Sequence, residues 1–285
     1  MKQRTLGDLQ VGAIGLGGMP LSIEGRPDRE RGIATIHAAL DSGVTLIDTA
    51  DAYHQPVEGD LGHNELLIAE ALRSYGGDTS AVLVATKGGH LRPPGENWTQ
   101  DGRPEHLKEA ARASAQRLGV EAIGLYQYHR PDSRVPYADS IGALAELLDE
   151  GVIVRAGISN ADPDQIREAH GILGSRLVSV QNQFSPSFRS SEPELELCAE
   201  LGLAFLPWSP LGGIGGAAEV GTRNAAFGTV AEAHGVSPQV VCLAWELAKA
   251  PVVLPIPGAS RPESIRDSAT AAELTLTAEE LASLG

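Results

Sequence analysis

Short apolar runs rich in valine, isoleucine and leucine alternate along the chain with longer segments in which alanine and leucine recur every three or four residues. Runs of the first kind predict buried β-strands, and the spacing in the second kind predicts helices with one apolar face. Repeated strand and helix patterns of this sort are typical of consecutive βα units. Eight runs predict strands: Ala13–Leu16, Val44–Asp48, Val82–Thr86, Ile123–Gln127, Ile153–Ile158, Leu177–Gln181, Ala204–Leu206 and Val252–Pro255.

The helical segments carry boundary signals of their own. Pro104–Leu118 and Tyr137–Glu150 have clear helical spacing, and Pro104 suits a first helical position because its missing N–H would have no partner there. Glycine favours the position that ends a helix, because it adopts the left-handed conformation without steric cost. We expect this role for Gly119, Gly151 and Gly202.

The number and order of these elements predict the architecture. Eight parallel strands with right-handed crossovers close more readily into a barrel than into an open sheet of that width. We therefore expect an α/β fold, a (β/α)8 TIM barrel, in a single domain over residues 1–285. A turn at Gly7-Asp8 predicts an N-terminal β-hairpin over Thr5–Val11 that plugs the barrel floor, and Arg92–Gly102 is expected to form a long loop.

Composition and charge narrow the functional classes. The formal net charge of −15, without a basic stripe, argues against a nucleic-acid partner. No signal peptide or membrane-spanning apolar segment is recognisable, so we expect a cytoplasmic protein without a membrane partner. Cys198 and Cys242 lie in helical segments, which indicates packing residues rather than a disulfide. The eight histidines show no paired-ligand spacing, so we expect no metal site.

Polar residues gather where three successive predicted strands end, which is where barrel enzymes carry their chemistry. The second strand ends at Asp48 and leads to Tyr53, the third leads to Lys87, and the fourth leads to His129. On adjacent strands, Lys87 would lie between Asp48 and Tyr53, where its charge would lower the pKa of the tyrosine. Considered alone, Asp48 would suit the cap of a loop, Lys87 would suit a solvated surface position, and His129 would suit the protein core. Their joint occurrence on one rim favours a catalytic site.

A series of motifs in this order resembles the aldo-keto reductase family over nearly the whole chain. The motifs are Gly43–Tyr53 (GVTLIDTADAY), Val84–Lys87, Tyr128–Asp132 (YHRPD), Gly157–Asn160 (GISN), Pro207–Gly212 (PWSPLG) and Ile256–Arg261 (IPGASR). The resemblance implies a catalytic tetrad of Asp48, Tyr53, Lys87 and His129. It further implies that Tyr53 protonates a carbonyl oxygen as a nicotinamide cofactor delivers hydride, so that aldehydes or ketones become alcohols.

The resemblance also implies which residues bind the cofactor. Ser159, Asn160 and Gln181 are expected to hydrogen-bond the nicotinamide carboxamide, and Trp208 to stack on its ring. A glycine-rich loop over Ser209–Gly216 would let backbone donors approach the pyrophosphate. Further contacts are expected from Ser209, Pro210, Leu211, Gly212, Gly258, Ser260, Arg261, Asp267 and Ser268.

The segment from Ser260 to Ser268 bears on the choice between NADP and NAD as the cofactor. Asp267-Ser268 stands where the family commonly has a Glu-Asn pair, which weakens the expected adenine contacts. Ser260 and Arg261, in contrast, begin a helix where backbone donors and a guanidinium favour a 2′-phosphate. We therefore expect NADP (NADPH) as the cofactor, with NAD as the alternative.

Residues of the loops are expected to form the substrate pocket. Trp98 and His129 are expected to contact a small carbonyl substrate, although Trp98 equally suits a loop anchor. No long C-terminal extension follows Leu281, which favours an open pocket and broad specificity. Two other functions stay open: a non-catalytic NADPH-binding regulatory subunit of the same fold, and a barrel lyase or isomerase acting on a sugar phosphate. Monomer and homo-oligomer are both compatible with the sequence.

Overall fold

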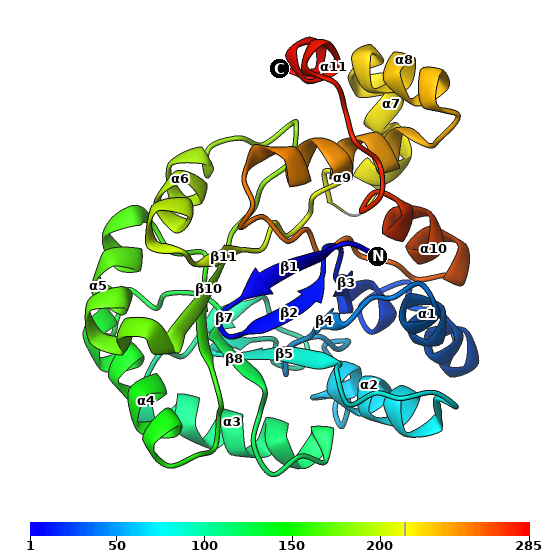
Figure 1. Cartoon of the computed structure of the whole chain (residues 1–285). Coiled ribbons are helices and arrows are strands. Elements are labelled where there is room, and N and C mark those ends of the chain that lie inside the picture. The colour runs from blue at the N-terminus through cyan, green and yellow to red at the C-terminus, as the bar shows by residue number, and fades with distance from the viewer. Residues whose placement is uncertain (214) are drawn as a thin grey trace.

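The computed structural model describes residues 1–213 and 215–285. Its main feature is a curled sheet of seven parallel strands in the spatial order β11-β10-β9-β8-β5-β4-β3 (Figure 1). In chain order these strands are β3 (Leu16–Gly17), β4 (Leu46–Asp48), β5 (Leu83–Gly88), β8 (Leu125–Tyr128), β9 (Ala156–Ser159), β10 (Leu177–Gln181) and β11 (Ala204–Phe205). Seven of the predicted strands are thus confirmed in order: β10 has the predicted bounds, and the other six have shifted ends.

The eighth predicted strand, Val252–Pro255, is not a regular strand, which corrects the expectation of eight. Its segment nevertheless lies between the last and the first strand of the sheet and forms isolated parallel bridges with both. Leu254 N–H donates to Phe205 O at 2.8 Å on one side, and Gly17 N–H donates to Pro257 O at 2.9 Å on the other. Because prolines 255 and 257 have no N–H to donate, the ladder stays incomplete although the ring closes.

Helices form an outer layer around the sheet (Figure 1). The helices that follow successive barrel segments are α1 (Arg29–Asp41), α2 (His63–Ser74), α3 (Pro104–Leu118), α4 (Tyr137–Asp149), α5 (Pro163–Leu173), α6 (Glu192–Leu201), α9 (Pro238–Lys249) and α10 (Pro262–Thr270). Shorter or additional helices are η1 (Met19–Leu21), η2 (Gly174–Arg176), η3 (Gly216–Glu219), α7 (Val220–Arg223), α8 (Ala225–His234) and α11 (Ala278–Leu284). The arrangement confirms the predicted α/β barrel fold.

Helix α3 begins and ends where the sequence predicts, for the predicted reasons. Pro104 lies in its first turn, and Gly119 at its C-cap has the left-handed φ of 71°. The C-cap of α4 is Glu150, so the left-handed Gly151 follows it rather than forming the cap itself. The loop after β5 is more regular than predicted, because β6 (His90–Leu91) pairs antiparallel with β7 (Thr99–Gln100) within it.

The N-terminal hairpin closes one end of the barrel. Strands β1 (Gln3–Leu6) and β2 (Leu9–Gly12) pair antiparallel around the predicted turn, and Figure 1 shows them lying across the barrel. Leu6 and Val11 are buried in one cluster with barrel residues Leu46, Leu83, Leu125, Val178 and Leu254. The predicted floor is confirmed, so access to the barrel interior is from the carboxyl ends of the strands.

Alternation along the strands makes the interior apolar near the hairpin and polar at the other end. On β5, Leu83 and Ala85 belong to the interior apolar cluster, and Lys87 continues the same face at the end of the strand. On β4, Leu46 belongs to that cluster and Asp48 follows two residues later. The polar ends of two paired strands therefore meet above an apolar base.

Candidate active site

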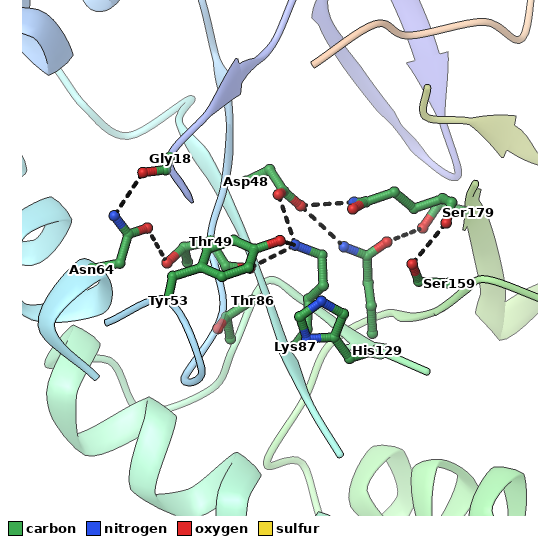
Figure 2. Close-up of polar contacts among 12 residues, drawn as sticks. Gly18, Asp48, Thr49, Tyr53, Asn64, Thr86, Lys87, His129, Ser159 and Ser179 are labelled. Atoms are coloured by element: carbon green, nitrogen blue, oxygen red, sulfur yellow. Dashed lines mark hydrogen bonds and ion pairs between the residues drawn. The ribbon is translucent and has the colours of Figure 1, made fainter. Parts of the chain in front are cut away.

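Lys87 lies at the centre of the candidate active site. Its ammonium donates to Asp48 Oδ2 at 2.7 Å, to Thr49 O at 2.9 Å and to Tyr53 OH at 2.9 Å, as Figure 2 shows. The side chain is fully buried, and these acceptors satisfy all of its N–H donors. Burial by itself lowers the pKa of Lys87, but the charges and hydrogen bonds of Asp48 and Tyr53 together outweigh it and the net pKa is raised, so the lysine stays protonated.

Asp48 is held in place by two glutamines as well as by the lysine. Gln181 Nε2 donates to Asp48 Oδ1 at 2.7 Å, and Gln127 Nε2 donates to the same oxygen at 3.4 Å. Ser179 Oγ in turn donates to Gln127 Oε1 at 3.4 Å. The amide nitrogen of Gln181 is therefore engaged within the site, and a cofactor contact by this residue would use Oε1.

His129 follows β8 and meets Tyr53 edge to face, with ring centroids 5.6 Å apart. Its Nδ1 is buried and has no hydrogen-bond partner among the residues that the structure describes. Burial lowers the pKa of His129 well below its usual value, and the charge of Lys87 lowers it further, so the imidazole is uncharged near neutral pH. A buried ring nitrogen without a partner is suited to contact a ligand atom.

The pKa of Tyr53 corrects one expectation. Burial raises this pKa more than the charge of Lys87 lowers it, so the value lies above that of free tyrosine rather than below it. The charge of Lys87 does lower the pKa of Tyr53, as predicted, but this effect is smaller than the effect of burial. The phenol is therefore protonated near neutral pH and carries a proton that it can donate.

A cavity of about 560 Å³ opens above these groups. Asp48, Tyr53 and His129 line it, whereas Lys87 lies beneath. Its volume is within the range of small-molecule and cofactor sites. The predicted cofactor residues that line it are Ser159, Asn160, Gln181, Trp208, Ser209, Pro210, Leu211, Gly258 and Ser260.

Two of these lining residues have an unusual backbone conformation. Asn160, with φ of 57°, and Ser209, with φ of 52°, are the non-glycine residues with positive φ in the described part of the chain. Such strain is concentrated at functional sites, because it persists only where the surroundings enforce it. Asn160 Nδ2 also donates to His129 O at 3.0 Å, which links the end of β9 to the residue that follows β8.

Other predicted cofactor residues do not line the cavity. Arg261 is exposed, and its Nε donates to Ser264 Oγ at 2.8 Å. Asp267 accepts from Ser237 Oγ at 2.6 Å instead of facing the cavity. Residue 214 of the glycine-rich loop lies outside the described residues, but Gly213 and Gly215 line the cavity. The predicted residues that do not line it are Gly212, Arg261, Asp267 and Ser268.

Trp98 belongs to a stack of side chains on the cavity wall. It lines the cavity, its ring stacks on His90 at a centroid distance of 4.6 Å, and the Arg92 guanidinium lies 4.8 Å from its ring. His90 in turn meets His129 edge to face at 4.9 Å. Burial lowers the pKa of His90 to about 4, so this ring is uncharged. Arg92 forms an ion pair with Glu24, which ties the loop down.

A buried charged network behind Lys87 is not apparent from the sequence. Thr86 Oγ1 donates to Glu65 Oε1 at 2.5 Å, and Arg117 Nε donates to Glu65 Oε2 at 2.5 Å. The backbone N–H of Asp51 donates to Lys87 O at 3.3 Å. Burial, with the charge of Glu65, raises the pKa of Asp51 to about 8. Glu65 and Arg117 lie on helices, where sequence alone cannot distinguish them from surface charges.

Sequence reasoning also missed several residues of the cavity wall. Arg130 directly follows His129 in the YHRPD motif, so extending the strand-end rule by one residue would have found it. Met19 and Ile23 come from the segment after β3 and have no distinctive sequence signal.

Within residues 1–213 and 215–285, no three His, Cys, Asp or Glu side chains lie together as a metal site. No helix of that described part is both long and apolar enough to cross a bilayer. Cys198 and Cys242 are buried and form no disulfide.

Known sequences resemble this chain over most of its length. The model of the aldo/keto reductase family matches residues 13–285. An uncharacterized oxidoreductase of Schizosaccharomyces pombe is 36% identical over 283 residues, which cover 98% of this chain and 87% of that protein. Pyridoxine 4-dehydrogenase of Escherichia coli is 32% identical over 290 residues, which cover 98% of this chain and 96% of the relative.

Solved structures share the fold. Glycerol dehydrogenase of Gluconobacter oxydans has a TM-score of 0.83 at 26% identity, covering 99% of this chain and 94% of that one. An aldo/keto reductase of Klebsiella pneumoniae, in complex with NADP and acetate, has a TM-score of 0.78 at 26% identity, covering 100% of this chain and 94% of that one. The chain therefore belongs to the aldo/keto reductase family, a family of oxidoreductases that use nicotinamide cofactors.

Proposed function

We propose that this protein reduces aldehydes or ketones to alcohols with NADPH, and that Tyr53 is the general acid. One observation carries the proposal: Lys87 Nζ lies 2.7 Å from Asp48 Oδ2 and 2.9 Å from Tyr53 OH, beneath a cavity that His129 also lines. Reduction of a carbonyl places negative charge on its oxygen. A proton donor and a neighbouring imidazole at that position stabilise the transition state more than the ground state.

The residues of the cavity fit a nicotinamide dinucleotide. Trp208 offers an aromatic plane, and its buried Nε1 has no partner among the described residues. Ser159 and Asn160 offer a hydroxyl and an amide, while Gly213 and Gly215 permit close approach to the backbone. When bound, NADPH would supply the hydride that adds to the carbonyl carbon.

The four side chains then have distinct roles in moving and holding a proton. Tyr53 donates its proton to the carbonyl oxygen, so that the added hydride and this proton together convert C=O to CH–OH. Lys87 stays protonated and stabilises the phenolate that remains, and Asp48 holds the lysine in place. His129, being uncharged, binds the carbonyl oxygen through a ring nitrogen and orients it toward the phenol.

The preference for NADPH over NADH is part of the proposal. Arg261 is the N-cap of α10, and Ser260 beside it lines the cavity. A helix N-terminus with a guanidinium suits the additional phosphate of NADPH. The related Klebsiella enzyme was solved with NADP. Asp267 and Ser268 give no support, because they lie away from the cavity.

We also infer that the chain acts as a single domain. Its first residue contacts the C-terminal part of the chain, because the Met1 amine is 3.6 Å from Glu273 Oε1. Its last residue is held by α9, because Trp245 Nε1 donates to Gly285 O at 3.2 Å. Limited proteolysis that released a stable fragment would argue against one cooperative unit.

The variant Tyr53→Phe tests the proposed acid. We expect the Kd for NADPH to stay unchanged while the rate of reduction of an aldehyde panel falls by roughly 10²–10⁴, the usual effect of losing a general acid. Cofactor fluorescence measures the first and loss of NADPH absorbance the second. Tyr75→Phe is the matched control, because its exposed hydroxyl donates to Asp41 away from the cavity.

Two outcomes would change the conclusion. Near-normal turnover by Tyr53→Phe would remove Tyr53 from the role of acid. Tight NADPH binding by the wild-type protein, with no turnover of any aldehyde or ketone in the panel, would instead favour the non-catalytic regulatory subunit.

A further inference from the structure

Arg130 is a cation on the cavity wall without a counter-charge. It follows His129 at the end of β8, is half-buried and lines the cavity. Within the described part of the chain, its guanidinium has neither a hydrogen bond nor an ion pair. A guanidinium has five N–H donors in a planar fork, so a half-buried one without acceptors has an unused capacity to bind oxygen atoms.

The groups around Arg130 do not cancel its charge. The other arginine of the cavity, Arg92, is already paired with Glu24. The charge of Lys87 is balanced by Asp48 at 2.7 Å. The imidazole rings of His90 and His129 on the same wall are uncharged, so they contribute no negative charge. The wall therefore carries a net positive charge at Arg130, although the whole chain has a formal net charge of −15.

Arg130 and the segment expected to bind the 2′-phosphate lie on opposite sides of the barrel. In the sheet order, β8 is the fourth of the eight barrel segments counted from β3, and the segment that leads to Gly258 and Ser260 is the eighth. Four positions around a ring of eight is the diametrically opposite place. Arg130 instead shares its wall with His129, which contacts the carbonyl group in the proposed function. Its position thus favours a contact with substrate rather than with a cofactor phosphate.

We propose that Arg130 binds an anionic group of the substrate, so that the protein prefers aldehydes or ketones that also carry a carboxylate or a phosphate monoester. This inference rests on the proposed reductase function and adds the substrate class. Both groups present paired oxygen atoms that match the guanidinium fork, and such charge-assisted pairs are stronger than neutral hydrogen bonds. The anion does not take part in hydride or proton transfer, so its binding lowers KM more than it raises kcat.

Matched aldehydes test the preference directly. The test compares 4-carboxybenzaldehyde and 4-formylphenyl phosphate with the neutral methyl 4-formylbenzoate, for wild type, Arg130→Met and Arg130→Lys. We expect wild type to favour at least one anionic aldehyde, and Arg130→Met to lose about ten- to hundredfold in kcat/KM for it, mainly through KM. The neutral ester should change by less than about threefold, and Arg130→Lys should restore part of the preference. The anionic aldehyde whose kcat/KM falls in Arg130→Met identifies carboxylate or phosphate as the recognised group.

A control and a binding measurement separate this inference from the proposed function. Arg31→Met removes an exposed cation of α1 outside the cavity, and should leave the preference intact. Calorimetric titration of the same aldehydes without cofactor measures recognition even if no turnover occurs, and the anionic preference in binding should also disappear in Arg130→Met.

The outcomes are distinct. Wild-type reduction of the ester with equal or lower efficiency for both anionic aldehydes would overturn the role of Arg130 and leave the reductase function standing. Equal losses for the ester and the anionic aldehydes, or a weaker Kd for NADPH in Arg130→Met, would also overturn it. No turnover of any aldehyde, with anionic binding that depends on Arg130, would support the anion site and contradict the reductase.

Discussion

The buried pair of Lys87 and Asp48 allows a sharp test of the electrostatics of the site. Lys87 is 0% exposed and Asp48 is 2% exposed, and their charged atoms are 2.7 Å apart. Removing one partner leaves the other as a buried charge without compensation, which costs about 3–5 kcal/mol in comparable pairs. Lys87→Met and Asp48→Asn should therefore each lower the free energy of unfolding by that amount. This is a large fraction of the roughly 5–15 kcal/mol of a typical domain.

The double variant distinguishes the pair from two independent residues. With both charges absent, no ion remains stranded, so the double variant should be more stable than the sum of the single losses predicts, by about 1–3 kcal/mol. Urea unfolding followed by circular dichroism at pH 7 supplies the four free energies. If a single variant fails to fold while the double variant folds, the coupling is larger still. Additivity within about 0.5 kcal/mol would refute the reasoning.

Two further predictions concern the network behind the site and the choice of cofactor. Burial raises the pKa of Asp51 to about 8, so folding takes up a proton between the unfolded value of about 4 and pH 8, and the free energy of unfolding falls as the pH rises through this window. Asp51→Asn, which has no charge to bury, should show a smaller fall in urea titrations from pH 5 to pH 8; equal slopes would contradict the raised pKa. Arg261→Ala should raise KM for NADPH more than KM for NADH, and an unchanged ratio of the two would exclude Arg261 from cofactor selection.

Much of the fold is predictable because its signals are local and repeat. Strand periodicity, the proline that begins α3 and the glycine that ends it all act within a few residues, and the barrel follows from their order. The prediction of a regular eighth strand was wrong, and the reason is equally local. Its prolines remove the donors that a ladder needs, whereas its burial keeps the apolar pattern of a strand.

The candidate site is predictable where the strand ends determine it. Asp48 and Lys87 belong to paired strands, so their proximity follows from the register. The net pKa of Tyr53 does not, because it depends on the balance between burial and a neighbouring charge. The orientation of the Asp267 side chain could not be predicted from the sequence either, because its contact with Ser237 depends on the packing of α10 against α9.

The seam of the barrel links ligand occupancy to the integrity of the ring. Pro255 and Pro257 accept hydrogen bonds from Gly15 and Gly17 but donate none, so the hydrogen bonds across this junction run in one direction only. Amide protons along such a junction are expected to exchange with solvent sooner than those of β5 or β8. The same stretch continues into the cavity wall at Gly258, and any molecule bound against it therefore reinforces the closure of the barrel at this junction.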